Sequence, residues 1–129
     1  MNKETVTIVL PLPKRVLSPN CPSFSVGGGF AKVAATKKYR RLAKEAVEDE
    51  CIDTAPWGKV KVKATFFFKT KRERDTDNAM GSIKAVYDGI VDSGLVANDT
   101  PEHMKRREPK FLHDSVHPRV ELTIIRMKS

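Results

Sequence analysis

The chain has 129 residues, of which 40% are hydrophobic and 31% are charged, and its formal net charge is +8 with a sequence pI of about 9.7. This composition excludes a largely disordered chain and is typical of one globular domain, residues 1–129, with a core of its own. No stretch approaches the roughly 20 apolar residues of a membrane-spanning helix. The first residues lead into a strand-like segment without the apolar region of a signal peptide, so we expect a cytoplasmic protein.

The positive charge fits a polyanionic partner, with nucleic acid ahead of a membrane surface. A basic protein without such a partner would have the same composition, so charge alone leaves both interpretations open. Cys21 and Cys51 are too few and too far apart for a metal knuckle or a disulfide framework, and we expect both to be reduced. The three histidines follow no zinc-binding spacing and are expected on loops or the surface. They are His103, His113 and His117.

The first predicted element is a strand at residues 5–10, which is apolar and β-branched and ends before Pro11. The loop that follows carries two basic residues, Lys14 and Arg15. The three glycines at positions 27–29 predict a flexible turn. They lack the Gly-Lys-Ser/Thr ending of a phosphate-binding loop, so we predict no nucleotide site there.

A helix is predicted at residues 34–51 from apolar residues at helical spacing. Its first half is basic and its second half acidic, which opposes the helix dipole. We therefore expect the basic half to face phosphates, although a solvated charged face would have the same pattern. The basic residues are Lys37, Lys38, Arg40, Arg41 and Lys44.

A second strand is predicted at residues 60–69, alternating at first and then continuously apolar. Four basic residues extend it toward Asp75. They are Lys69, Lys71, Arg72 and Arg74. Bases that lead directly into acids suit a site that holds both a phosphate and a metal ion.

The segment 74–78 reads Arg-Asp-Thr-Asp-Asn and opens a helix predicted to continue to residue 94. Asp75 and Asp77 lie at the junction between strand and helix, and Asp99 follows the helix. Several carboxylates brought together in this way would hold one hard cation. In a continuous helix Asp77 would share a face with Lys84 and Asp88. The alternative is that Asp75 or Asp77 caps the helix and that Lys84 and Asp88 form a solvent-exposed pair.

Two further strands are predicted, a weak basic one at 104–111 and a clearly alternating one at 119–126, paired as a hairpin. The predicted fold is therefore α+β, with helices packed on a mixed sheet and the order β-α-β-α-β-β.

Several of these segments resemble the RusA-like Holliday junction resolvases, small endonucleases that cut branched DNA. The resemblance covers nearly the whole chain. Its motifs are Leu-Pro-Leu-Pro at 10–13, Ser-Pro-Asn at 18–20, Lys-Lys-Tyr-Arg at 37–40, Asp-Thr-Asp-Asn at 75–78, Lys-x-x-x-Asp-Gly-Ile at 84–90 and Gly-Leu to Asp at 94–99. Lys84 follows Asn78 by six residues rather than the three of the best-known form, and it is matched through its spacing to Asp88.

The resemblance implies an α+β fold and Mg²⁺-dependent hydrolysis of DNA phosphodiester bonds, with Mn²⁺ as a substitute, during recombination and repair. Asp75, Asp77 and Asp99 would hold the metal. Lys84 would neutralise the phosphate, and Asn78 would orient a carboxylate or a water. The DNA-binding residues would be Lys14, Arg15, Lys37, Lys38, Arg40, Arg41, Lys69, Lys71, Arg72 and Arg74.

A four-way junction has approximate two-fold symmetry, so the expected assembly is a homodimer with an isologous interface. The resemblance also implies a protein encoded by a bacterium or a phage. Two alternatives stay open. One is a non-catalytic DNA- or RNA-binding protein, and the other is a nuclease for flaps or other branched DNA, such as phage replication intermediates.

Overall fold

The computed structural model describes residues 4–17, 28–50, 56–71 and 74–127. Within these ranges the fold is α+β, as predicted. The elements are β1 (Thr5–Leu10), the 3₁₀ helix η1 (Arg15–Leu17), α1 (Gly28–Glu48), β2 (Val60–Phe68), α2 (Thr76–Ser82), α3 (Lys84–Asp92), β3 (Met104–Arg106), β4 (Lys110–His113) and β5 (Arg119–Arg126).

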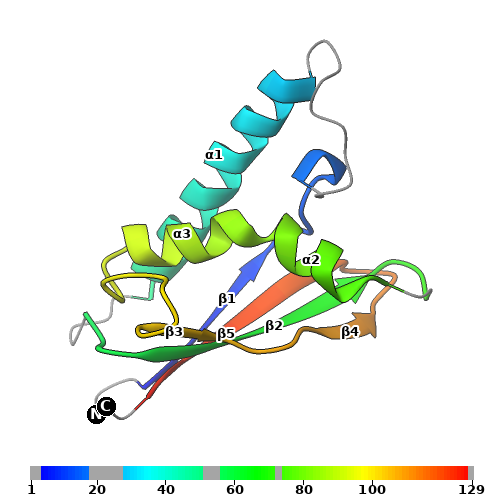
Figure 1. Cartoon of the computed structure of the whole chain (residues 1–129). Helices are drawn as coiled ribbons and strands as arrows, with labels where there is room; N and C mark the ends of the chain where they lie inside the picture. Colours follow the sequence, from blue (N-terminus) through cyan, green and yellow to red (C-terminus); the bar gives the residue numbers. More distant parts are fainter. Residues whose placement is uncertain (1–3, 18–27, 51–55, 72–73, 128–129) are drawn as a thin grey trace.

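The sheet is mixed, and β2 lies at its centre (Figure 1). β5 runs antiparallel to both β1 and β2. β3 and β4 both run parallel to β2, with β3 along its first residues and β4 along its last. The prediction of a hairpin between the last two segments is therefore wrong. β5 instead fills the gap between β1 and β2, where its buried face, Val120, Leu122 and Ile124, lies at the middle of the sheet.

The predicted strand at 104–111 is two short strands separated by residues 107–109. Each runs along a different part of β2, since Lys105 pairs with Lys61 and Lys110 with Thr65. His113, expected in a loop, is the last residue of β4, and its Nε2 lies 2.9 Å from the carbonyl oxygen of Lys69.

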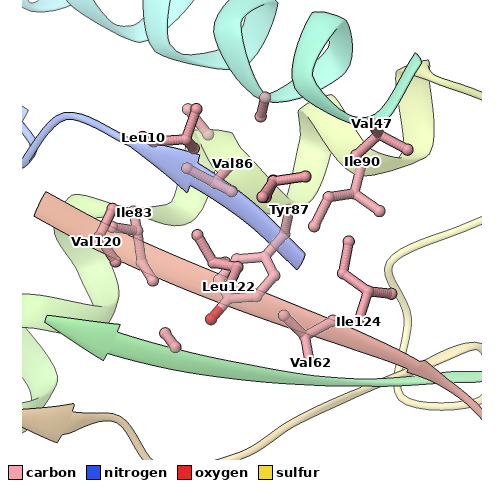
Figure 2. Packing of buried hydrophobic residues seen from close by; sticks show 14 of the residues in the cluster. Leu10, Val47, Val62, Ile83, Val86, Tyr87, Ile90, Val120, Leu122 and Ile124 are labelled. Carbon is pink, nitrogen blue, oxygen red and sulfur yellow. The ribbon is translucent and has the colours of Figure 1, made fainter. Parts of the chain in front are cut away.

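All the long helices lie on one face of the sheet, and no described helix covers the other face (Figure 1). Strand alternation is the reason, since buried residues alternate with more exposed ones along β1 and along β2 and β5 up to their last residues. Figure 2 shows Val62, Leu122 and Ile124 of the sheet facing Tyr87 and Ile90 of α3. These five side chains are almost fully buried.

The helix predicted at 34–51 begins at Gly28 and ends at Glu48. Gly28 and Gly29, predicted in a flexible turn, belong to its first turn, while Gly27 lies outside the described residues. The predicted apolar stripe is correct: Tyr39, Ala43 and Val47 are buried. The stripe also explains where the helix packs, because the Tyr39 hydroxyl donates to the carbonyl of Pro11 at 2.8 Å, just beyond β1.

The helix predicted to run on from residue 79 to residue 94 is two helices, α2 and α3, interrupted at Ile83. Ile83 has φ −108° and ψ 14°, outside helical geometry. Gly81 weakens the last turn of α2. The Ser82 hydroxyl donates to the carbonyl of Ala79 at 2.7 Å, so it competes with the backbone pattern. The expected shared face of Asp77 with the residues of α3 therefore does not follow from one continuous helix.

α1 and α3 cross closely at Gly89. A Cβ at this position would lie 2.3 Å from the carbonyl oxygen of Arg40 and 2.7 Å from the Cβ of Ala43. Both are contacts that real Cβ atoms do not make. Glycine is therefore required at position 89 because the two backbones touch there.

Trp57 is 1% exposed and forms a bridge with Val96. The backbone N–H of Trp57 donates to the backbone carbonyl of Leu95 at 2.6 Å. This contact fixes the segment after α3 against the start of β2, which in turn positions the loop that carries Asp99. Within the described part of the chain, none of the helices has the length and apolar character needed to cross a membrane.

Candidate metal and nucleic-acid site

Asp75 is the N-cap of α2. Its backbone is extended, with φ −86° and ψ 120°, and its Oδ1 accepts a hydrogen bond from the Asn78 N–H at 3.2 Å. This is the arrangement that aspartate favours at a helix start. The capping interpretation of Asp75 is therefore correct. Because a carboxylate has two oxygens and several lone pairs, capping leaves acceptor capacity on Asp75.

Asp77 lies in the first turn of α2 and is exposed. It has no hydrogen bond or ion pair with any other residue that the structure describes. A negative charge in the first helical turn is favoured by the helix dipole. Asp77 is thus held at the helix start while its carboxylate faces solvent.

Three of the predicted DNA-binding residues meet this helix start. A pocket of about 460 Å³ is lined by Lys14, Arg15 and Arg74 together with Asp75 and Asn78. The chain brings them there from two directions, since Lys14 and Arg15 follow β1 and Arg74 follows β2. The pocket therefore combines cations that can hold a phosphate with a carboxylate that can hold a metal ion.

Contacts with Phe68 and Thr70 hold Arg74 in that pocket. Its guanidinium carbon lies 3.8 Å from the centroid of the Phe68 ring. The Nη2 of Arg74 also donates to the carbonyl oxygen and the hydroxyl of Thr70, at 3.2 and 3.5 Å. An arginine stacked in this way keeps its planar donors oriented with less loss of side-chain freedom on binding.

Asp99 lies at the other end of the two helices. It accepts from Nη2 of Arg106 at 3.3 Å and lies beside Asp88 of α3. Asp88 and Asp77 are 11 residues apart, which corresponds to roughly 16 Å along helices placed end to end as α2 and α3 are in Figure 1. Within one protomer, the structure does not bring Asp99 to Asp75 and Asp77.

Burial, followed by the neighbouring carboxyl of Asp99, raises the pKa of Asp88 above its usual range, and the charge of Arg40 opposes that shift. Lys84 is exposed and contributes a smaller favourable charge to Asp88. No ion pair joins Lys84 to Asp88, and Arg40 has the larger effect on this carboxyl, so the predicted solvent-exposed pair is not formed. Arg106 also stacks on Tyr87, with its guanidinium carbon 4.1 Å from the ring centroid. Burial raises the pKa of Tyr87 to about 12.

Arg40, predicted to face phosphates, instead binds Asp92 of α3. Its Nε and Nη2 donate to the two carboxylate oxygens, the latter at 2.9 Å. The hydrogen bonds from Arg40 lower the pKa of Asp92. Arg40 therefore joins α1 to α3, which a sequence pattern on α1 alone cannot reveal.

The remaining predicted DNA-binding residues are exposed where the structure describes them. Lys37, Lys38 and Arg41 lie on α1, and Lys69 and Lys71 follow β2. Arg72 lies outside the described residues. Arg41 also makes a long contact of 3.8 Å with Glu45, one turn further along α1.

Among the residues that the structure describes, no three histidine, cysteine, aspartate or glutamate side chains are grouped closely enough to hold a metal ion. Mg²⁺ is commonly held by one or two protein carboxylates, with water and substrate phosphates as the other ligands. Asp75 and Asp77 fit that smaller set, with three cations nearby to hold a phosphate. Asp99 can complete the set only if it comes from a second protomer.

Sequence reasoning missed the role of Arg106. The signal was present in the basic segment 104–111, but only the pairing of β3 with β2 places Arg106 between Tyr87 and Asp99. A comparison with models of protein families and another with curated proteins found no match to this chain.

Proposed function

We propose that this protein is a metal-dependent endonuclease that cuts phosphodiester bonds in branched DNA, with the four-way junction as its substrate. The observation that supports this most strongly is the pocket at the start of α2, where Asp75 meets Lys14, Arg15 and Arg74, with Asp77 two residues further on. Carboxylates and cations together suit a phosphodiester that must be both bound and hydrolysed. The resemblance of the motif 75–78 to the RusA-like resolvases points the same way.

In this proposal Asp75 and Asp77 hold Mg²⁺ or Mn²⁺ at the N-terminal end of α2. When bound, such a cation lowers the pKa of water and stabilises charge on the leaving oxygen. Lys14, Arg15 and Arg74 bind the phosphate oxygens, and the stacking of Arg74 on Phe68 keeps its donors oriented. Asn78 holds one oxygen of Asp75 through its backbone N–H, which fixes the carboxylate.

Lys84 and Asp99 do not line the α2 pocket. Lys84 is the first residue of α3, and Asp99 lies beside Asp88 of the same helix. The homodimer implied by a two-fold symmetric junction is the arrangement in which Asp99 of one protomer can approach the Asp75–Asp77 pair of the other. Light scattering should therefore give the mass of a dimer at working concentration. A monomer mass with and without DNA would remove this route for Asp99.

The first test is cleavage of junction, fork, flap, duplex and single-stranded DNA with and without Mg²⁺. We expect cuts in the junction only when metal is present. Binding without cleavage of any substrate would favour the non-catalytic DNA- or RNA-binding protein. Faster cleavage of flaps or forks than of junctions would favour the nuclease for other branched DNA.

A further inference from the structure

The face of the sheet that carries no described helix has a groove of about 710 Å³. It lies between β5, β2 and the edge formed by β3 and β4, and it shares no lining residue with the pocket at the start of α2. Its polar lining is mostly basic, and Glu108 is the one acid among the described residues that line it. The main polar lining residues are Lys63, Thr65, Lys105, Arg107, Lys110 and Thr123.

The sheet register places lysines of this face beside one another. Lys61 of β2 pairs directly with Lys105 of β3, and Lys63 follows two residues along the same face of β2. Neighbouring strands lie about 4.8 Å apart. Like charges directly opposite each other destabilise a sheet. This arrangement therefore costs stability unless an anion binds there.

No described residue neutralises these lysines. Lys61, Lys63, Lys105 and Lys110, which we name the open-face lysines, form no ion pair with another residue that the structure describes. On the same face, the carboxylate of Glu121 is bound by Arg119 at 3.0 Å. The face is thus left with positive charge that faces solvent.

Lysines on an edge strand also prevent two sheets from joining edge to edge, and that role would explain Lys105 and Lys110. It does not explain Lys61 and Lys63, because β2 is flanked by β5 on one side and by β3 and β4 on the other. A central strand needs no such protection. Edge protection therefore does not account for the two lysines at alternate positions on the open face of β2.

We propose that the open-face lysines form a second phosphate-binding surface, which takes a duplex arm of the DNA whose branch point lies at the α2 pocket. The proposal rests on the proposed function, since it assumes branched DNA at that pocket. Strand β4 separates the two surfaces. Lys110 lines the open groove, while the ring of the next residue, Phe111, contacts Phe66 and Phe68 beside the α2 pocket. Two arms that diverge at a branch can pass on either side of this edge.

The test is the salt dependence of DNA binding in EDTA, which is independent of cleavage. We compare the wild type with Lys63→Gln/Lys105→Gln, using fluorescence anisotropy of a labelled short duplex between about 50 and 200 mM salt. Each lost phosphate contact lowers the slope of log K against log salt by about 0.9. The double variant should therefore bind with a slope shallower by about 2 and a Kd raised by about tenfold or more at the lowest salt.

The matched control is Lys32→Gln/Arg126→Gln, which removes the same charge from α1 and from the end of β5, outside both proposed surfaces. We expect this control to keep a slope close to that of the wild type. Equal slopes for the wild type and Lys63→Gln/Lys105→Gln would overturn the proposal. So would an equal loss in the control, or a wild type that does not bind duplex DNA.

If Lys63→Gln/Lys105→Gln melts well below the wild type, the single variant Lys110→Gln decides, with an expected change in slope of about 1. Cleavage of a junction in Mg²⁺ is measured separately. A wild type that binds with the expected salt slope but never cuts would refute the nuclease and leave this surface standing. A wild type that cuts junctions, together with variants whose salt slope is unchanged, would support the nuclease and refute the second phosphate-binding surface.

Discussion

The two ends of the α2–α3 pair both carry carboxylates, but their surroundings differ. At the α2 end, Asp77 is exposed and has no partner among the described residues, and Asp75 uses one oxygen to cap the helix. At the α3 end, Asp92 is bound by Arg40 and Asp99 by Arg106. Acids already neutralised by arginine stabilise the fold, whereas acids held in place without an ion pair have capacity for a ligand. The comparison therefore marks the α2 end as the candidate site within one protomer, with Asp99 a ligand only if it comes from a second protomer.

The largest expected difference between the two ends is in cleavage. Asp77→Asn should lower the rate of junction cleavage in Mg²⁺ by at least about 100-fold, the usual effect of removing one preorganised charged group from a site. The reason is that an amide lacks the anionic oxygen that a hard cation requires. Asp92→Asn, at the other end, should cut within a few-fold of the wild type.

The Asp77→Asn variant should also fold and bind. Asp75, not Asp77, caps α2, so the change leaves the cap intact. Loss of a negative charge beside the bound phosphate should strengthen junction binding at low salt, which a gel shift in EDTA would show. Cleavage by Asp77→Asn at the wild-type rate would show that the Asp77 carboxylate is not needed for cleavage and would contradict the metal site at the α2 end.

The crossing of α1 and α3 provides the next test. Gly89→Ala should lower the free energy of unfolding by about 1–3 kcal/mol, because the new methyl group overlaps the backbone of Arg40 and the side chain of Ala43. Urea denaturation would measure the loss. Gly58→Ala is the matched control, since its new methyl group would meet no atom within 4 Å beyond its chain neighbours, and its effect should be small. Equal effects for the two variants would show that α1 and α3 can separate at little cost.

A smaller effect is expected for the ion pair that joins the same helices. A double-mutant cycle with Arg40→Ala and Asp92→Ala should give a coupling free energy of about 0.5–1 kcal/mol, the upper range for partly exposed pairs, because Nε and Nη2 of Arg40 each donate to one carboxylate oxygen of Asp92. Arg41 and Glu45, which are more exposed and 3.8 Å apart, should give a coupling near zero. Coupling that is no larger for Arg40 and Asp92 would leave the α3 cluster without a stabilising role.

The smallest expected effect is on the pH dependence of stability. Burial and Asp99 raise the pKa of Asp88 in the folded state, so the fold favours the protonated form. That contribution is complete below the ordinary pKa of 3.8 and is lost as the pH rises through the raised value. The wild type should therefore lose stability relative to Asp88→Asn as the pH rises above 3.8, by a small amount because the site is partly solvated.

Thermal melts of both proteins across that pH range would measure the difference. A constant difference would mean that Asp88 has the same pKa in the folded and unfolded chain. A difference of opposite sign would mean that Arg40 and Lys84 lower the pKa of Asp88 by more than burial and Asp99 raise it.

Elements whose pattern is local could be predicted from the amino-acid sequence. Alternation located β1, β5 and nearly all of β2. Helical spacing identified the buried stripe of α1, and Asp75 at a strand-to-helix junction identified a cap. These features depend on residues within a few positions of one another, whose periodicity and hydrogen-bonding capacity are visible in the chain.

Contacts between distant segments could not be predicted in this way. The position of β5 between β1 and β2, the closeness of α1 to Gly89 and the binding of Arg40 to Asp92 depend on packing between segments far apart in the chain. Asp99 was expected to join Asp75 and Asp77, but it lies beside Asp88, and the helical residues of α2 and α3 between Asp77 and Asp88 hold the two ends apart. The neighbouring lysines of β2 and β3 came together for the same reason, since strand register is set by the sheet rather than by either strand alone.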